Sequence, residues 1–313
     1  PKLRWGWFKK KLEEKYELTE GARLGPGPNH DTEAKVLNRI IRWTDSGIEY
    51  EADPRQGEHI INDLQLTGAK SVSTPGVKPD GDQVVKDTEL TGDRTRAFRA
   101  VCARSNYRSA DRPACQFSAK EICRWMSAPT ELGVPALKRL GRFIEGHKRL
   151  VFQYDWQSAK GVGIYSDTDW TGCIRTRKST SGGCLMLGSH LIKPWSSTQG
   201  QISLSSGESE FYGVVRASGI ALGFQALMRD LGFKISLRVW TDSSAQMGFV
   251  EDRAWGKLRH IDTQALCIHQ RVRDKSIELR KVRGEVTPAD LFTSTSLVVT
   301  DRITALPKLF GCE

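Results

Sequence analysis

The order of apolar runs between residues 161 and 294 is the feature that most constrains the fold of this chain. Three short strand-like runs are followed by a long helix, a strand, two helices, a strand and a final helix. The expected elements lie, in that order, at 161–167, 182–188, 190–197, 206–231, 236–242, 243–250, 260–273, 276–282 and from 287 onward. Strands that alternate with helices after a hairpin-like start predict an α/β domain.

Four acidic residues stand where these elements begin or end. Asp167 and Asp242 end strands, and Glu210 and Asp290 lie in the first turns of helices. The carboxyl ends of neighbouring strands in an α/β sheet open into one crevice, so we expect the four carboxylates to converge there. Crowded carboxylates need cations, and such hard oxygen ligands suit Mg²⁺ or Mn²⁺. Two ions about 4 Å apart can stabilise the attacking and leaving oxygens of a phosphodiester displacement.

Each of these carboxylates also has a purely structural interpretation. Asp167 could be a turn residue, and Glu210 an acid favoured by the helix dipole. Asp242 could cap the next helix, and Asp290 could take part in a cap with Thr287. A cap is the commoner use of any one such residue, whereas the order of all four along the strand–helix plan favours a metal site.

Three neighbouring residues are expected to be structural. Glu208 follows Ser205 by three residues, which is the spacing of a capping box. Trp170 and Trp195 could border a substrate groove, but core packing is the more frequent role of tryptophan.

The chain before residue 155 has a different character. A Gly/Pro-rich loop, two strand-like runs, a short helix, a polar linker and a long helical region are expected at 23–34, 36–42 and 48–53, 60–66, 71–93 and 94–147. This half is therefore predicted to be mainly helical.

The charge balance favours a polyanionic partner. The net charge is +10, and a basic surface supplies phosphate contacts that do not depend on sequence. Arg175, Arg177 and Lys178, on the turn after the first strand of the C-terminal half, are candidate phosphate contacts. A solvated basic turn is the equally weighted alternative.

Cysteine usage and hydropathy indicate an intracellular protein. The seven cysteines include no pair with CxxC spacing, which argues against a disulfide framework and a structural zinc site. No apolar run approaches the length that crosses a bilayer, so no membrane partner is expected. The chain begins with Pro and shows no signal peptide, so we expect a piece of a longer polypeptide.

Six motifs of the C-terminal half resemble the ribonuclease H domain of copia-type retrotransposon Pol polyproteins. They are YSDTDWTGC (165–173), RKSTSGG (177–183), SLSSGESEFYG (203–213), VWTDSSAQ (239–246), RHID (259–262) and TPADLFT (287–293). The resemblance implies a ribonuclease H-like five-stranded mixed sheet with helices on both faces. It also implies that the catalytic, metal-binding carboxylates are Asp167, Glu210, Asp242 and Asp290, which would hold two Mg²⁺ ions or Mn²⁺ in their place.

The upstream half resembles the end of a copia-type reverse transcriptase. The residues that carry this likeness are 9–18, 70–79 and 107–150. It implies the end of a palm and thumb at 1–80, a helical thumb and connection region at 81–154, the ribonuclease H-like domain at 155–295 and a tail at 296–313. The Tyr-x-Asp-Asp signature of the polymerase is absent, so we expect no DNA synthesis from this chain alone.

The chain departs from the ribonuclease H pattern near its last motif. Residues 283–289 contain no His, although cellular ribonucleases H carry one on a loop before the last Asp. Ordinary packing or surface roles are expected for His260 and His269. The residues after the last motif are Thr293 and Ser294, where the family commonly has Thr-Lys.

The functional hypothesis is a metal-dependent endonuclease that hydrolyses the RNA strand of RNA–DNA hybrids during reverse transcription. Its expected partners are the hybrid and the remainder of the reverse transcriptase or Pol polyprotein. Its expected location is the retrotransposon particle in the cytoplasm, or the nucleus. The alternatives are a non-catalytic hybrid-binding module and a purely structural part of a reverse transcriptase.

Overall fold

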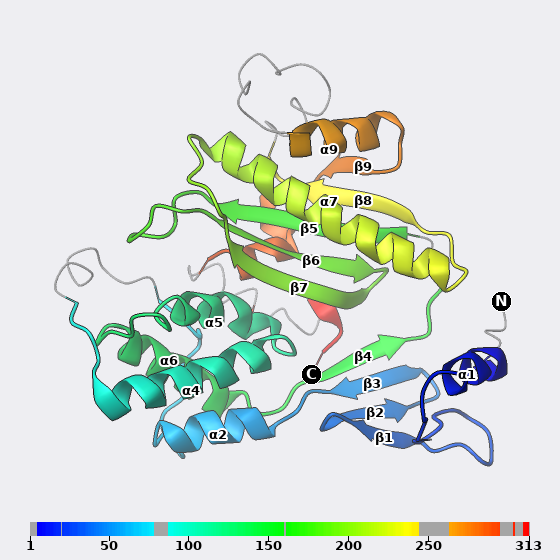
Figure 1. Cartoon of the computed structure of the whole chain (residues 1–313), viewed down its shortest axis with the longest axis horizontal. Helices are drawn as coiled ribbons and strands as arrows, with labels where there is room; N and C mark the ends of the chain where they lie inside the picture. Colours follow the sequence, from blue (N-terminus) through cyan, green and yellow to red (C-terminus); the bar gives the residue numbers. More distant parts are fainter. Residues whose placement is uncertain are drawn as a thin grey trace.

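The computed structural model describes residues 5–19, 21–77, 87–159, 161–243, 263–294, 303 and 309–312. Two β-sheets and a group of helices make up this part of the chain (Figure 1). The expected helix at 243–250, apart from its first residue, and His260 lie outside the described residues.

The larger sheet is mixed and has five strands in the order β7-β6-β5-β8-β9. Its strands are β5 (Gly161–Asp169), β6 (Thr180–Leu187), β7 (His190–Thr198), β8 (Ser236–Thr241) and β9 (Glu278–Lys281). The first three run antiparallel to one another, whereas β8 lies parallel to β5 and β9 parallel to β8. The α/β class and the five-stranded mixed sheet expected from the sequence are therefore confirmed.

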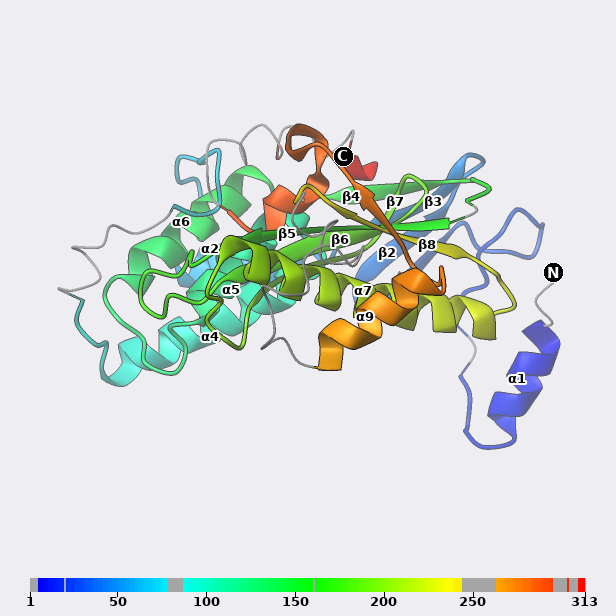
Figure 2. The same ribbon diagram turned by 90° about the horizontal axis from the view of Figure 1, so that it is seen from above.

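Helices cover both faces of this sheet. On one face, α7 (Ser206–Asp230) packs against β5, β6 and β8, with α9 (Thr263–Arg273) beside it (Figures 1 and 2). Alternate residues of a strand point to opposite faces. Leu185 accordingly joins the core beneath α7, while Cys184 and Met186 join a second core on the other face. The expectation of helices on both faces is confirmed.

The second core belongs to a group of helices that we call the helical module. It consists of α2 (Arg55–Asp63), α4 (Gly92–Ser109), η1 (Pro113–Cys115), α5 (Gln116–Cys123) and α6 (Gly133–Gly146). Buried side chains of these helices, such as Leu140 and Phe98, belong to one cluster with Phe292 of the 3₁₀ helix η4 (Pro288–Phe292). The helical module and the five-stranded sheet thus share one hydrophobic core.

The smaller sheet contains the two strand-like runs expected at 36–42 and 48–53, within a half of the chain that was expected to be mainly helical. Its antiparallel strands, in order, are β1 (Glu33–Val36), β2 (Arg39–Trp43), β3 (Gly47–Glu51) and β4 (Val151–Asp155). The single strand expected at 36–42 is a hairpin, because Leu37 and Asn38 both adopt positive φ, as a two-residue type I′ turn requires. A short helix, α1 (Trp5–Glu13), precedes it.

The end of the chain returns to this sheet. The Gln153 backbone N–H donates to the Gly311 carbonyl at 2.7 Å, and Phe152 forms a bridge with Cys312. Phe310 is buried in the core of the helical module. The described part of the tail is therefore packed against β4.

Two further local features differ from simple expectation. Pro194 lies inside β7, which is tolerated because β7 is an edge strand that pairs only with β6. Within the described residues one helix, α7, is long and apolar enough to cross a membrane, contrary to the sequence-based expectation. Its Val214, Ala217 and Ala221 pack into the core of the sheet, which accounts for that composition.

Candidate active site

Three of the four predicted carboxylates converge at one end of the five-stranded sheet. Asp167, Glu210 and Asp242 can each place one oxygen within 4.8 Å of the others. The strand register explains the first part of this cluster. Tyr165 of β5 pairs with Trp240 of β8, so two residues later Asp167, inside β5, and Asp242, directly after β8, reach the same level of the sheet.

The start of α7 positions the third carboxylate. Ser205 Oγ accepts a hydrogen bond from the Glu208 backbone N–H at 3.2 Å, and Glu208 Oε2 accepts one from the Leu204 backbone N–H at 2.7 Å. Glu208 is thus a capping residue, as predicted. Glu210 is only 8% exposed, and its Oε2 has no hydrogen-bond partner among the described residues. A buried carboxylate oxygen without a donor fits a cation ligand better than a cap.

The electrostatics of the cluster point the same way. Burial, together with the negative charge of Asp167, raises the pKa of Glu210 to about 8. Burial also raises the pKa of Asp167, with a smaller contribution from the charge of Asp242, although a hydrogen bond from Thr293 opposes the rise. Without a cation Glu210 therefore retains a proton near neutral pH, and a divalent cation would displace it.

Asp290 lies beside this cluster rather than in it. It belongs to η4, whose N-terminus is capped by Thr287, with Oγ1 accepting from the Ala289 backbone N–H at 3.4 Å and Pro288 in the first turn. Asp290 is not a member of the group of ligand atoms that lie within 4.8 Å of one another. The final helix expected from the sequence is this short 3₁₀ helix, and a metal-binding role for Asp290 stays a prediction.

Thr293 is a site residue that the sequence alone did not identify. The only signal near it was Ser294, which stands where the family commonly has Lys. The Thr293 hydroxyl donates a hydrogen bond to Asp167 Oδ2 and also contacts the Asp290 carbonyl oxygen at 3.3 Å. Gly182, which pairs with Asp167 across β5 and β6, makes room for this contact. A Cβ at position 182 would lie 2.6 Å from the Phe292 carbonyl oxygen and from the Thr293 methyl group.

The basic turn after β5 is partly engaged with the protein itself. The Arg175 guanidinium lies 5.0 Å from the ring centroid of Trp125, and Lys178 Nζ donates to the Gly200 carbonyl at 2.6 Å. The Arg177 side chain is exposed. Phosphate binding by the three basic residues stays a prediction.

The expectations for the other residues named from the sequence have different outcomes. Trp195 is buried in the core beneath α7, as expected. Core packing was wrong for Trp170, which is 43% exposed and donates its indole N–H to the Ser203 carbonyl at 3.1 Å. His269 lies on α9. Six of the cysteines are free thiols, namely Cys102, Cys115, Cys123, Cys173, Cys184 and Cys312.

The chain is similar in sequence to known retrotransposon proteins. No family model matches it. It is 29% identical over 198 residues to the Retrovirus-related Pol polyprotein from transposon RE1 of Arabidopsis thaliana, covering 61% of this chain. It is 23% identical over 264 residues to that from transposon TNT 1-94 of Nicotiana tabacum, covering 82% of this chain. The chain is a homologue of the copia-type retrotransposon Pol polyproteins.

This Pol homologue spans only 13% and 20% of the lengths of those two polyproteins. It spans 74% of the Uncharacterized mitochondrial protein AtMg00810 of Arabidopsis thaliana, to which it is 29% identical over 185 residues, or 59% of this chain.

Among solved structures, the N-terminal ribonuclease H domain of rv2228c from Mycobacterium tuberculosis is similar, with a TM-score of 0.31 and 13% identity. The match covers 47% of this Pol homologue and 100% of that chain. LC11-RNase H1 in complex with RNA/DNA hybrid also has a TM-score of 0.31, with 12% identity. That match covers 42% of this chain and 93% of the LC11-RNase H1 chain.

Proposed function

We propose that this chain is the ribonuclease H part of a Pol polyprotein, a metal-dependent endonuclease that hydrolyses the RNA strand of RNA–DNA hybrids during reverse transcription. One observation carries the proposal. Asp167, Glu210 and Asp242, which are far apart in the sequence, converge within 4.8 Å, and Glu210 keeps a buried oxygen without a partner among the described residues. Residues that only cap helices or turns are not expected to place their carboxylates this close together.

The residues present fit divalent cations. All three ligating groups are carboxylates, which suits Mg²⁺, with Mn²⁺ as a substitute. Two bound ions would supply a water of lowered pKa and charge stabilisation of the leaving 3′-oxygen. Asp290, one residue after Ala289 in η4, is the proposed fourth ligand.

The other groups of the chain orient these ligands. Thr293 donates to Asp167 and so fixes which carboxylate oxygen remains available. Glu208 and Ser205 together cap the first turn of α7. This cap fixes the start of the helix that carries Glu210. The site thus rests on strand β5, on the residue that directly follows β8 and on a capped helix start, which keeps its geometry well defined.

The similarity to Pol polyproteins and the net charge of the chain support the proposed substrate class. The homologous Pol polyproteins are retrovirus-related, and the net charge of +10 suits a nucleic acid held through its phosphates. Discrimination for RNA would come from the 2′-hydroxyl groups and the shape of the hybrid. The proposed partners are the hybrid and the remainder of the Pol polyprotein, with no membrane, inside the cytoplasmic retrotransposon particle or the nucleus.

The test is cleavage of an end-labelled RNA–DNA hybrid in Mg²⁺, in Mn²⁺ and in EDTA, with duplex DNA as the substrate control. We expect cleavage of the RNA strand in either metal, leaving 5′-phosphate and 3′-hydroxyl ends, and none in EDTA. Intact hybrid after prolonged incubation of folded protein with metal would favour the rival, a non-catalytic binding or structural module.

Two neighbouring glutamates of α7 give a matched pair for that experiment. Glu210→Gln should abolish cleavage because it removes a ligand charge, with little change in stability. Glu208→Gln keeps a capping acceptor two residues earlier and should retain most cleavage. Equal loss of cleavage in both variants would mean that the start of α7, rather than the carboxylate cluster, limits activity.

A further inference from the structure

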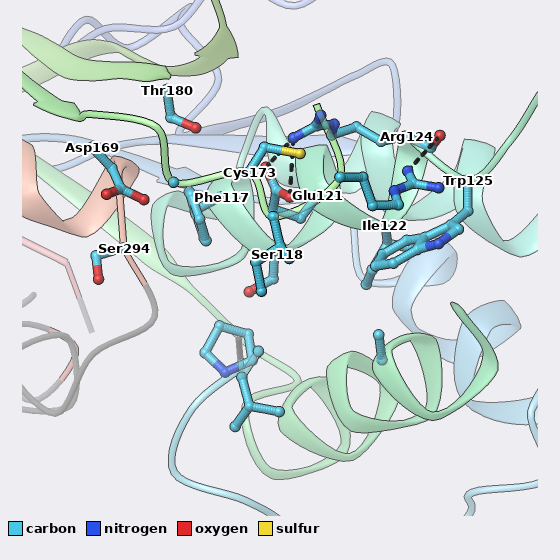
Figure 3. A pocket seen from close by; sticks show the side chains of 17 residues that line it. Phe117, Ser118, Glu121, Ile122, Arg124, Trp125, Asp169, Cys173, Thr180 and Ser294 are labelled. Atoms are coloured by element: carbon cyan, nitrogen blue, oxygen red, sulfur yellow. Dashed lines mark hydrogen bonds and ion pairs between the residues drawn. The ribbon is translucent and has the colours of Figure 1, made fainter. Parts of the chain in front are cut away.

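A cavity lies between the helical module and the turn that follows β5. It holds about 130 Å³ of space for the centres of water-sized molecules, and its mouth opens to solvent. Figure 3 shows Asp169 and Ser294 at one end and Trp125 at the other. The helical module and the five-stranded sheet both contribute to its wall.

The cavity adjoins the carboxylate cluster. Asp169 follows Asp167 by two residues on β5, so both side chains leave the same face of the strand, about 6.6 Å apart along it. Ser294, which also lines the cavity, directly follows Thr293. A nucleic-acid strand seated at the carboxylates would therefore have its next nucleotides within reach of the cavity.

The lining combines apolar side chains with a buried hydroxyl group that has no hydrogen-bond partner among the described residues. Phe117, Ile122 and Trp125 supply the apolar surface. Ser118 is 3% exposed, and its Oγ has no hydrogen-bond partner among the described residues. Leaving a buried hydroxyl without a partner costs free energy, and the polar edge of a planar ligand would remove that cost.

The charges that line the cavity include a cation with donors to spare for an anion. The Glu121 carboxylate pairs with Lys120 and, at 3.4 Å, with Arg124. Arg175 donates one hydrogen bond to a described residue, the Arg124 carbonyl at 3.4 Å, out of the five N–H donors of a guanidinium. Its remaining donors suit a phosphate group.

We propose that this cavity binds a nucleotide, with its heterocyclic base against Phe117 and Ser118 and its phosphate at Arg175. In the setting of the proposed function, on which this part of the inference rests, the nucleotide is an unpaired one next to the hybrid. The helical module would then take part in selecting substrates that carry a single-stranded extension.

The first test measures binding of adenosine and uridine 5′-monophosphate to the full chain in EDTA, by ligand-observed NMR and calorimetry. Ser118→Ala should weaken binding about three- to tenfold, the effect of one lost hydrogen bond. Ala136→Phe, which fills the cavity from α6, should abolish it. Ser218→Ala is the matched control, because Ser218 Oγ is equally buried and has no partner among the described residues, but lies on α7.

Inorganic phosphate alone is the probe for a simple anion site. We expect it to bind far more weakly than either nucleotide and to lose its affinity in Arg175→Gln. Equal affinity for phosphate and nucleotide would overturn the proposal, as would nucleotide binding that is unchanged in both Ser118→Ala and Ala136→Phe. Correct folding of the variants is checked by their melting temperatures.

A second experiment separates a free nucleotide from a strand end. Affinity for a blunt hybrid is compared with affinity for the same hybrid carrying a single-stranded extension, again in EDTA. The extension should tighten binding by wild type several-fold and leave binding by Ala136→Phe unchanged. Tight mononucleotide binding without any effect of the extension would assign the cavity to free nucleotides and overturn the strand-end part of the inference.

Failure of this inference is distinguishable from failure of the proposed function. Cleavage of a blunt hybrid in Mg²⁺ by a protein that binds no nucleotide would overturn the cavity assignment alone. Nucleotide binding by a protein that never cleaves would leave the cavity assignment and overturn the enzyme.

Discussion

The Thr293 hydroxyl donates a hydrogen bond to the Asp167 carboxylate across 126 residues of sequence. Thr293 directly follows η4, and Asp167 lies in β5, the central strand of the five-stranded sheet. The hydrogen bond ties the residue that directly follows η4 to the first carboxylate of the candidate site. It therefore links the packing of η4 to the orientation of a proposed metal ligand.

Removal of that hydrogen bond should affect both stability and activity. Thr293 is 1% exposed, so Thr293→Val removes a buried donor from the partly buried Asp167 carboxylate and should cost about 1–2 kcal/mol. Because the hydrogen bond lowers the pKa of Asp167, its loss should also raise the pH at which cleavage reaches its plateau. Thr293→Ser, which keeps the hydroxyl, is the control. Identical pH profiles for Val and Ser would show that the Thr293 hydroxyl does not act on Asp167.

Neutral substitutions of the clustered carboxylates should separate ligands from caps. Asp167→Asn, Glu210→Gln and Asp242→Asn keep shape but remove charge, so each should lose nearly all cleavage. Melting temperatures in EDTA should stay equal or rise, because crowded like charges disfavour the metal-free fold. A variant that unfolds more easily yet still cleaves would be a cap and not a ligand.

The metal-free protein should become less stable as the pH rises from about 4.5 to about 8. The pKa of Glu210 is raised from 4.5 to about 8 in the folded chain. Over this window the folded state therefore holds a proton that the unfolded state has released, so stability falls with pH. Thermal melts in EDTA should show this slope, reduced in Glu210→Gln and offset by Mg²⁺ at the alkaline end. A slope unaffected by Glu210→Gln would contradict the burial of this charge.

Asp290 allows a direct choice between a ligand and a structural residue. If it holds metal, Asp290→Asn should reduce turnover, less in Mn²⁺ than in Mg²⁺, with a small change in melting temperature. If it only supports η4, Asp290→Ala should cost about 1 kcal/mol and leave turnover normal. Because it lies outside the cluster of three, we expect a smaller loss of turnover than for Asp167→Asn. Normal activity in both variants would remove Asp290 from the site.

The basic turn should reveal itself in the salt dependence of hybrid binding. The logarithm of affinity should fall linearly with the logarithm of salt concentration. Joint replacement of Arg175, Arg177 and Lys178 by Gln should reduce that slope by about 0.9 for each phosphate that the variant no longer neutralises. Arg229→Gln is the control, since Arg229 lies near the far end of α7, about 28 Å along the helix from Glu210. An unchanged slope would return the turn to an ordinary solvated role.

The sequence by itself determined the local structure of the C-terminal half. The strands at 161–169, 180–187 and 190–198 and the helix at 206–230 follow the alternation and the helical spacing of their apolar residues. The capping role of Glu208 followed from its distance to Ser205. These features were predictable because each depends on residues within a few positions of one another.

Only the tertiary structure decided which distant residues meet. The small sheet forms because β3 pairs with β4, which lies about a hundred residues later in the sequence. No local sequence pattern predicts such a partner. The same holds for the Thr293–Asp167 hydrogen bond, for the position of Asp290 outside the cluster, and for the cavity beside Asp169. Periodicity reports which face of an element is apolar, whereas the contacts between elements depend on how those faces pack in three dimensions.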